Sequence, residues 1–158
     1  MQKNKMENWL LPDTIEQSKK LLQSYEALTG VQLFEANYSD AYRSYLLYHA
    51  PIVVVSHGIE QDPIFNYANL TAQQLWHIDW DAFTALPSRL SAEAGRLEDR
   101  QRSLEEVSKN GFVKNYSGIR IASTGKRFRI ENVLIWNLLS AENKIMGQAA
   151  LFRDWTNL

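Results

Sequence analysis

Residues 51–58 read Pro-Ile-Val-Val-Val-Ser-His-Gly, and residues 62–76 read Asp-Pro-Ile-Phe-Asn-Tyr-Ala-Asn-Leu-Thr-Ala-Gln-Gln-Leu-Trp. Within the first run, residues 52–55 are β-branched and continuously apolar, which predicts a strand covered on both faces. Glycine, aspartate and proline between the runs supply turn chemistry, and residues 64–68 predict a second strand. A capping box over residues 71–74 predicts a helix with Leu75 and Trp76 on its apolar side. The stretch therefore predicts two strands closed off by a helix.

Two helices are predicted before this stretch. Asp13-Thr-Ile-Glu16 has the form of a capping box and Thr29-Gly30 that of a helix stop, so residues 13–29 predict an amphipathic helix. Ser39 is placed to cap a second helix, which ends before Pro51. The first helix carries one apolar stripe, formed by Ile15, Leu21, Leu22, Tyr25 and Leu28. This stripe either packs on the domain or forms a homodimer contact, and the sequence leaves both possibilities open.

The last third of the chain changes from helical to strand periodicity. Residues 112–122, 127–139 and 144–155 predict three strands, and the short turns between them make these strands antiparallel. A charged helix is predicted over residues 92–109. The order predicts an α+β domain with one five-stranded antiparallel sheet and helices on one face. We expect residues 1–49 to form an N-terminal helical extension and residues 50–158 to form the core.

Composition narrows the classes of function. The chain has 158 residues, a net charge of −1 and no cysteine. A neutral chain has no global field for a polyanion, so no nucleic-acid partner is expected. The absence of cysteine excludes disulfides, thiolate metal sites and cysteinyl-flavin adducts. No signal peptide or membrane-spanning run is visible, so we expect a cytoplasmic protein with no membrane partner.

The predicted sheet carries sequence motifs of a known fold. Its order of two strands, helices and three strands resembles the PAS fold, with Tyr67-Ala-Asn leading into a helix and Phe152-Arg-Asp-Trp155 resembling the end of the last PAS strand. Several segments resemble the MEKHLA domain family, a PAS-related group, over nearly the whole chain. These segments are Ala50 to Gly58, Asp62 to Asn69, Pro87-Ser-Arg-Leu90, Tyr116 to Gly125 and Phe128-Arg-Ile130.

The resemblance carries expectations about function. MEKHLA domains occur as stand-alone bacterial proteins and as the C-terminal domain of plant class III homeodomain-leucine-zipper regulators. Neither a homeodomain nor a zipper can be read in this sequence, so it resembles the stand-alone bacterial type. PAS-like domains sense small ligands, redox state or light, or mediate dimers. The resemblance therefore implies a non-enzymatic sensory or regulatory module, which could signal through protein association.

Cofactor chemistry can be tested against the residues present. A haem sensor needs an axial ligand, often a histidine on the long helix. The three histidines are His49, His57 and His77, and none falls within residues 92–110. They also lack the paired spacing of a metal site. No cofactor is identifiable and haem is not expected, while binding of an unknown small molecule between sheet and helices stays open.

One polar residue interrupts an apolar face of the strand at 127–139. If strict alternation holds, Asn132 lies on the face of Phe128, Ile130 and Trp136, and it needs a partner because a buried unpaired amide costs about 1–3 kcal/mol. This orientation predicts a pocket between sheet and helices. Its candidate residues are Tyr67, Trp76, Tyr116, Arg120, Asn132, Trp136 and Gln148.

Three hypotheses stay open for this interior. The candidate residues bind a small molecule, or they satisfy one another within a filled-core interaction scaffold. The third is a small α+β enzyme using the same concavity. No acid/base pair is recognisable for it, because Glu131 and Asp154 lie on predicted strands and nothing in the sequence places them together.

Overall fold

The computed structural model describes residues 6–92, 105–107 and 109–158, which fall into two compact units, Met1–Ala50 and Pro51–Leu158. Most of the predicted charged helix over residues 92–109, including Arg96, Arg100 and Arg102, lies outside the described residues. Of its described residues, 105–107 and 109 are helical, whereas Ala92 is extended and forms an antiparallel bridge with Arg120, so the predicted start of this helix is wrong. None of the helices in the described part has the length and apolar run that a membrane crossing demands.

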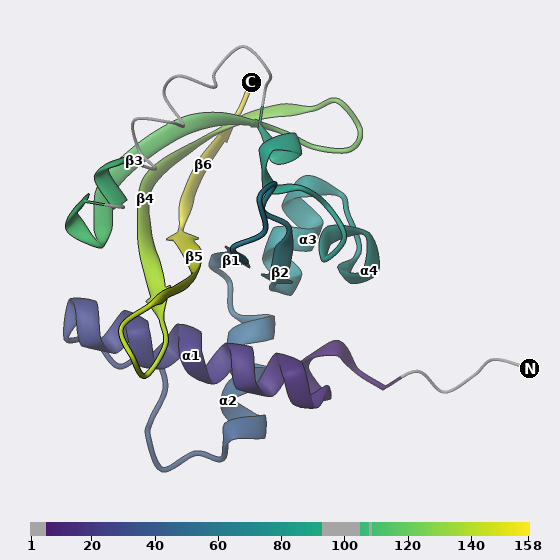
Figure 1. Ribbon diagram of the computed structural model, residues 1–158. Coiled ribbons are helices and arrows are strands. Elements are labelled where there is room, and N and C mark those ends of the chain that lie inside the picture. Colours follow the sequence, from purple (N-terminus) through teal and green to yellow (C-terminus); the bar gives the residue numbers. More distant parts are fainter. Residues whose placement is uncertain (1–5, 93–104, 108) are drawn as a thin grey trace, which may run out of the picture. The chain divides into compact units, whose positions relative to one another are not determined.

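The first unit contains a short 3-10 helix η1 (Asn8–Leu10) and two α-helices, α1 (Pro12–Thr29) and α2 (Asp40–His49) (Figure 1). Helix α1 begins at Pro12, whose fixed φ suits a first helical position. The predicted capping role of Asp13 is therefore wrong, since this residue already lies inside the first turn and no side chain caps the helix. Ser39 caps α2 as predicted, because its hydroxyl accepts the Tyr42 amide at 3.1 Å.

The second unit is built on one antiparallel sheet in the order β2-β1-β5-β4-β3, with β6 paired to β4. The prediction of an α+β fold with a five-stranded sheet is confirmed for this main order, and β6 adds a sixth strand. The strands are β1 (Val53–His57), β2 (Phe65–Ala68), β3 (Phe112–Ile121), β4 (Arg127–Leu139), β5 (Ile145–Phe152) and β6 (Asp154–Asn157).

The last predicted strand, residues 144–155, is interrupted at Arg153. Its first part, β5, pairs with both β1 and β4, whereas β6 pairs with β4. Strand β4 changes partner at the same level, because Glu131 lies opposite Asp154 of β6 and Leu134 lies opposite Leu151 of β5. Asn132 falls between these two pairings and has a positive φ of 54°. The register of the β3–β4 ladder shifts between Tyr116 and Gly118, and Asn132 is the extra residue of β4 at that point, so it is a bulge residue.

Helix α3 (Leu70–Trp76) follows β2 directly and begins two residues earlier than the predicted capping box implies. The cap is Asn69, whose Oδ1 accepts the Ala72 amide at 3.2 Å. The assignment of the cap to Thr71 is therefore wrong. Helix α4 (Trp80–Phe83) is capped by Asp79, and the 3-10 helix η2 (Ser88–Ser91) comes next.

The core of the second unit lies between the sheet and helices α3 and α4, which lie beside β1 and β2 in Figure 1. Trp76 is at its centre and is 2 % exposed. Its ring packs edge-on against Phe128 at 5.2 Å, Phe83 at 5.7 Å and Phe152 at 6.2 Å between ring centroids. Four aromatic rings from one helix pair and two strands thus fill much of the space between the layers.

Candidate functional site

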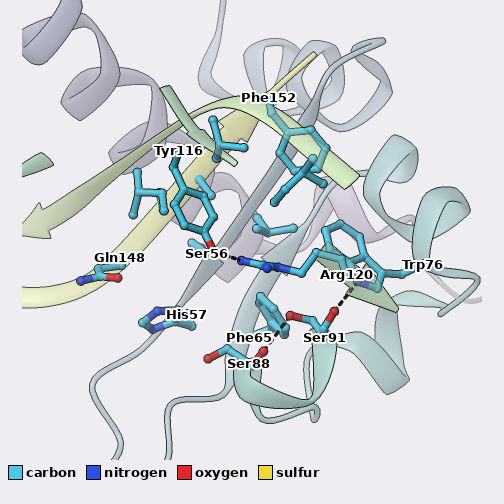
Figure 2. Close-up of a pocket in the computed structure, with 16 residues that line it drawn as sticks. Ser56, His57, Phe65, Trp76, Ser88, Ser91, Tyr116, Arg120, Gln148 and Phe152 are labelled. Atoms are coloured by element: carbon cyan, nitrogen blue, oxygen red, sulfur yellow. Dashed lines mark hydrogen bonds between the residues drawn. The ribbon is translucent and has the colours of Figure 1, made fainter. Parts of the chain in front are cut away.

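A cavity of about 90 Å³ lies between the sheet, α3 and η2 (Figure 2). It is bounded by side chains from five strands and both of these helices. One wall is apolar, and the polar groups come from β1, β3, β5 and η2. The described lining is Val55, Ser56, His57, Phe65, Trp76, Ser88, Ser91, Tyr116, Arg120, Ile130, Val133, Ile135, Gln148, Ala149, Ala150 and Phe152.

The most distinctive pair in this lining comes from alternate positions of β3. Tyr116, Gly118 and Arg120 pair with Val133, Ile130 and Phe128 of β4, so all three face the core. Arg120 Nη2 donates to Tyr116 Oη at 3.1 Å, and the guanidinium lies 5.5 Å from the centre of the tyrosine ring. Gly118 lies between them, and a Cβ there would come within 2.7 Å of Tyr116 Oη and 2.9 Å of Arg120 Nη1. The glycine therefore leaves the space in which the two side chains meet.

The rest of the polar lining is held by local hydrogen bonds. Trp76 Nε1 donates to the Ser91 carbonyl at 3.2 Å, and Ser91 Oγ donates to the Ser88 carbonyl at 2.7 Å. On the sheet side, Ser56 Oγ donates to Asn66 Oδ1 at 2.6 Å. These bonds fix the orientation of the wall around the arginine and tie η2 to α3.

At the end of β1, His57 lies next to the loop that leads to β2. One of its ring nitrogens, Nδ1, is 2.9 Å from the Gly58 carbonyl. Farther along the loop, the Glu60 carboxylate accepts the Ile64 amide at 3.1 Å. That hydrogen bond is the main reason that the pKa of Glu60 lies below its ordinary value, and the bond from its own amide and the charge of His57 act in the same direction. Glu60 is therefore held as a carboxylate that closes the loop.

Four of the predicted site residues line the cavity, namely Trp76, Tyr116, Arg120 and Gln148. Tyr67 and Trp136 do not line it, although both are buried. Tyr67 precedes Ala68 and Trp136 follows Ile135, and these two neighbours face the helices. Successive side chains of a strand point to opposite faces, so Trp136 points away from the cavity. In β2 the register shifts between Tyr67 and Phe65, so that Phe65 lines the cavity while Tyr67 packs edge-on against Trp80 of α4.

The structure corrects the predicted orientation of Asn132. Ile130 and Val133 both face the core, three positions apart rather than two, because Asn132 is the extra residue of the bulge. Its side chain is exposed and donates to Asp154 Oδ2 at 3.2 Å. Asparagine is among the few non-glycine residues that tolerate a positive φ, so its presence within an apolar strand was a signal for the bulge.

The polar lining residues that sequence reasoning missed are three serines and one histidine. Ser56, Ser88 and Ser91 are buried, and His57 is half-buried. Serine is common on surfaces and in turns, so nothing in its spacing indicates a cavity. Gly118 was the available signal, because a glycine inside a strand often marks a close approach.

Two other features are weaker candidates for a functional site than the cavity. A surface groove of about 300 Å³ is lined by residues including His77, Lys126 and Asn157, but these polar side chains are exposed and therefore hydrated. Glu131 and Asp154 do lie opposite each other in the β4–β6 ladder, which the sequence did not indicate. Neither carboxylate belongs to the lining of the cavity. Among the described residues, no cluster of histidine and acidic side chains could hold a metal ion.

The comparison with known families matches the MEKHLA domain over residues 15–157. This chain belongs to the MEKHLA domain family. Similar curated proteins include the homeobox-leucine zipper proteins HOX10 of Oryza sativa and ATHB-15 of Arabidopsis thaliana, each 21% identical over 147 residues. The match covers 92% of this chain but only 17% and 18% of those two proteins. The MEKHLA domain thus spans about a fifth of these relatives or less.

Solved structures place the MEKHLA domain in the PAS fold. A PAS domain from Colwellia psychrerythraea superposes with a TM-score of 0.63 at 14% identity, over 72% of this chain and 93% of that one. An RNA-binding light-oxygen-voltage receptor superposes with a TM-score of 0.65 at 13% identity, over 80% of this chain and 35% of that one. A fungal LOV domain photoreceptor gives 0.59 at 12% identity, over 87% and 91%. At these identities the likeness establishes the fold alone.

Proposed function

We propose that the MEKHLA domain is a non-enzymatic sensory module that binds a small molecule in the cavity between its sheet and helices. The observation that carries this proposal is the mixed lining, in which an apolar wall faces a guanidinium and a phenol. Small-molecule sites combine a mainly apolar wall with a few convergent polar groups in this way. His57 is the single described lining residue of the type that titrates near neutrality, which supports binding rather than acid/base chemistry.

The size of the cavity limits the ligand. An engineered cavity of about 150 Å³ holds benzene, which has six heavy atoms. A cavity of about 90 Å³ would by the same scale take roughly four heavy atoms. A flavin or haem ring is several times larger, so neither is our proposed ligand. The domain would share the fold of the light-oxygen-voltage proteins without their chromophore.

Filling the cavity tests this proposal. Ala150 lies on β5 and lines the cavity, and Ala150→Leu adds three carbon atoms to this lining. We expect the variant to fold and to lose the small molecule, because the added side chain occupies the same volume. The measurement is mass spectrometry of small molecules released from wild type and variant, with circular dichroism to monitor the fold.

The matched control is Ala82→Leu, which adds the same atoms at an exposed position of α4. It should keep both fold and ligand. The competing possibility is a filled-core interaction scaffold, and the aromatic packing around Trp76 favours it, because it already occupies much of the interior. If wild type releases nothing and Ala150→Leu only raises the melting temperature, the scaffold replaces the sensor.

We also propose that the module signals by self-association through its first unit, with α1 as the contact. The apolar residues Leu21, Leu22 and Tyr25 are already buried within one chain, so the contact would use the exposed side that includes Lys20 and Gln23. Light scattering of wild type should then give a dimer mass. Lys20→Glu with Gln23→Glu should lower this mass, whereas Lys126→Glu, an exposed charge reversal in the second unit, should not. An unchanged mass in the double variant excludes this side of α1 from the contact.

A further inference from the structure

The charge balance of the cavity suggests what kind of molecule it binds. Arg120 is half-buried and lines the cavity, yet no carboxylate forms an ion pair with it among the described residues. The ion pairs found there are Lys19–Asp40 and Arg89–Asp62, away from the lining. Removing a charged group from water is costly unless a partner compensates for it. A negative group supplied by a ligand would provide this compensation.

We propose that the cavity binds a short-chain carboxylate of about the size of acetate, held by Arg120 and Tyr116. This inference rests on the proposed function, since it names the chemical class of the ligand in the same cavity. A guanidinium has five N–H donors in a planar fork that matches a carboxylate. Arg120 uses two of its donor groups within the described residues, Nη1 to the Ile119 carbonyl at 3.0 Å and Nη2 to Tyr116 Oη at 3.1 Å. The remaining donors are available to a ligand.

Tyr116 is oriented to act with the arginine. Its oxygen accepts a hydrogen bond from Arg120, so its own O–H proton is available to donate to an anion. Figure 2 shows the phenol and the guanidinium meeting inside the cavity. Two donor groups thus converge where an oxygen anion would be bound, and Gly118 leaves the space between them.

The apolar wall favours a carboxylate over an inorganic anion. Ile130, Val133 and Phe152 belong to the lining and offer no hydrogen-bond donor from their side chains. A doubly charged phosphate would leave oxygens unpaired against this wall, which is costly. A carboxylate bears its charge at one end and a small apolar group at the other. Its alkyl end can therefore contact the wall while its oxygens meet the arginine.

The decisive comparison uses the wild-type chain with acetate and acetamide, which have the same shape and differ in charge. Ionic strength is held constant with sodium chloride, and the reporter is the Trp76 indole N–H signal in a ¹⁵N–¹H spectrum, since Trp76 lines the cavity. We expect acetate to shift this signal in a saturable way. The affinity for acetamide should be lower than that for acetate by roughly tenfold or more, because acetamide forms no charge-assisted pair with the arginine.

Substitutions at Arg120, Tyr116 and Gly118 test whether the arginine–tyrosine pair is the binding site. Arg120→Gln should abolish the saturable shift, Tyr116→Phe should weaken acetate binding several-fold, and Gly118→Ala should weaken it by displacing both side chains. Arg129→Gln is the matched control, because Arg129 is exposed on β4 and outside the lining, and it should bind acetate like wild type. Circular dichroism monitors the fold, and the comparison of acetate with acetamide holds even if Arg120→Gln does not fold.

The outcomes separate this inference from the proposed function. Equal binding of acetate and acetamide, or acetate binding that survives Arg120→Gln in a folded variant, overturns the carboxylate inference and leaves a small-molecule module. Release of a neutral or cationic metabolite from the wild-type protein does the same. If neither probe binds and wild type releases nothing, both the inference and the sensor function fail.

Discussion

Replacing Asn69 by alanine should lower the free energy of unfolding by about 3–5 kcal/mol, measured by urea denaturation with tryptophan fluorescence. Asn69 is fully buried and joins β1 to α3. Its Oδ1 accepts the amides of Val54 at 3.1 Å and Ala72 at 3.2 Å, and its Nδ2 donates to the Ile52 carbonyl at 2.7 Å. The variant loses the helix cap and also leaves two main-chain groups without this partner, the Val54 amide of β1 and the Ile52 carbonyl just before β1. Each buried unpaired group costs about 1–3 kcal/mol.

Asp79→Ala is the control for Asn69→Ala. Asp79 caps α4 through a single bond from the Ala82 amide at 2.9 Å, and it is exposed. Its removal should cost only about 1 kcal/mol, the usual value of an N-cap. Equal losses in the two variants would mean that Asn69 acts as a cap alone. In that case, its bonds to β1 would contribute nothing to stability.

Gly147→Ala should cost about 3 kcal/mol, the upper end of the range for overpacking a core, and should also weaken ligand binding. A Cβ at this position would lie 2.3 Å from the His57 carbonyl oxygen, a main-chain atom of β1. Strands β1 and β5 would have to separate to admit it. The next pair in that ladder is His57 with Gln148, and both residues line the cavity. Urea denaturation measures the first effect and acetate titration the second.

Gly118→Ala provides the contrast for the loss of stability. Its added Cβ would meet only the ends of two side chains, Tyr116 Oη and Arg120 Nη1, which can move. The free energy of unfolding should therefore change by less than about 1 kcal/mol, while acetate binding falls. A Gly147→Ala variant as stable as Gly118→Ala would show that β1 and β5 can separate without cost. The main-chain contact at His57 would then not be the reason for glycine at position 147.

Three of these substitutions, at Asn69, Gly147 and Gly118, concern the strands that surround the cavity. Asn69 and Gly147 hold β1 against α3 and β5, and that strand carries His57 at the edge of the cavity. Gly118 leaves the space in which the two donors, Tyr116 and Arg120, meet on β3.

Local patterns predicted most of the strands and helices. The β-branched run before Ser56 was recognisable as a buried strand, and the short turns of the last third required antiparallel neighbours. Caps were less certain because two candidates lay close together. Both Asn69 and Thr71 are good capping residues. Asn69 is the cap because its side-chain amide also forms hydrogen bonds with the main chain of Val54 and Ile52, which are distant in the sequence.

The candidate site was predictable only in part, because the strands that form it do not keep a regular alternation of side chains. Strict alternation placed Tyr116 and Arg120 together correctly, because β3 is regular from Gly118 onward and Tyr116 pairs with Val133. The same rule misplaced Asn132, because the bulge shifts the alternation by one position. It also misplaced Trp136, because the bulge turns this residue to the face opposite Phe128 and Ile130, and Tyr67, because the β1–β2 register shifts between Tyr67 and Phe65.

The sequence by itself determined the order of the elements, the antiparallel sheet, the likeness to the MEKHLA family and the absence of cysteine chemistry. These follow from periodicity, turn residues and composition, which act over a few neighbouring positions. Only the tertiary structure decided which side chains surround the cavity, how small it is, and that Arg120 meets Tyr116 over Gly118. A cavity is the space left by side chains that are distant in the chain. Its size and charge therefore depend on bulges and close approaches that no local pattern measures.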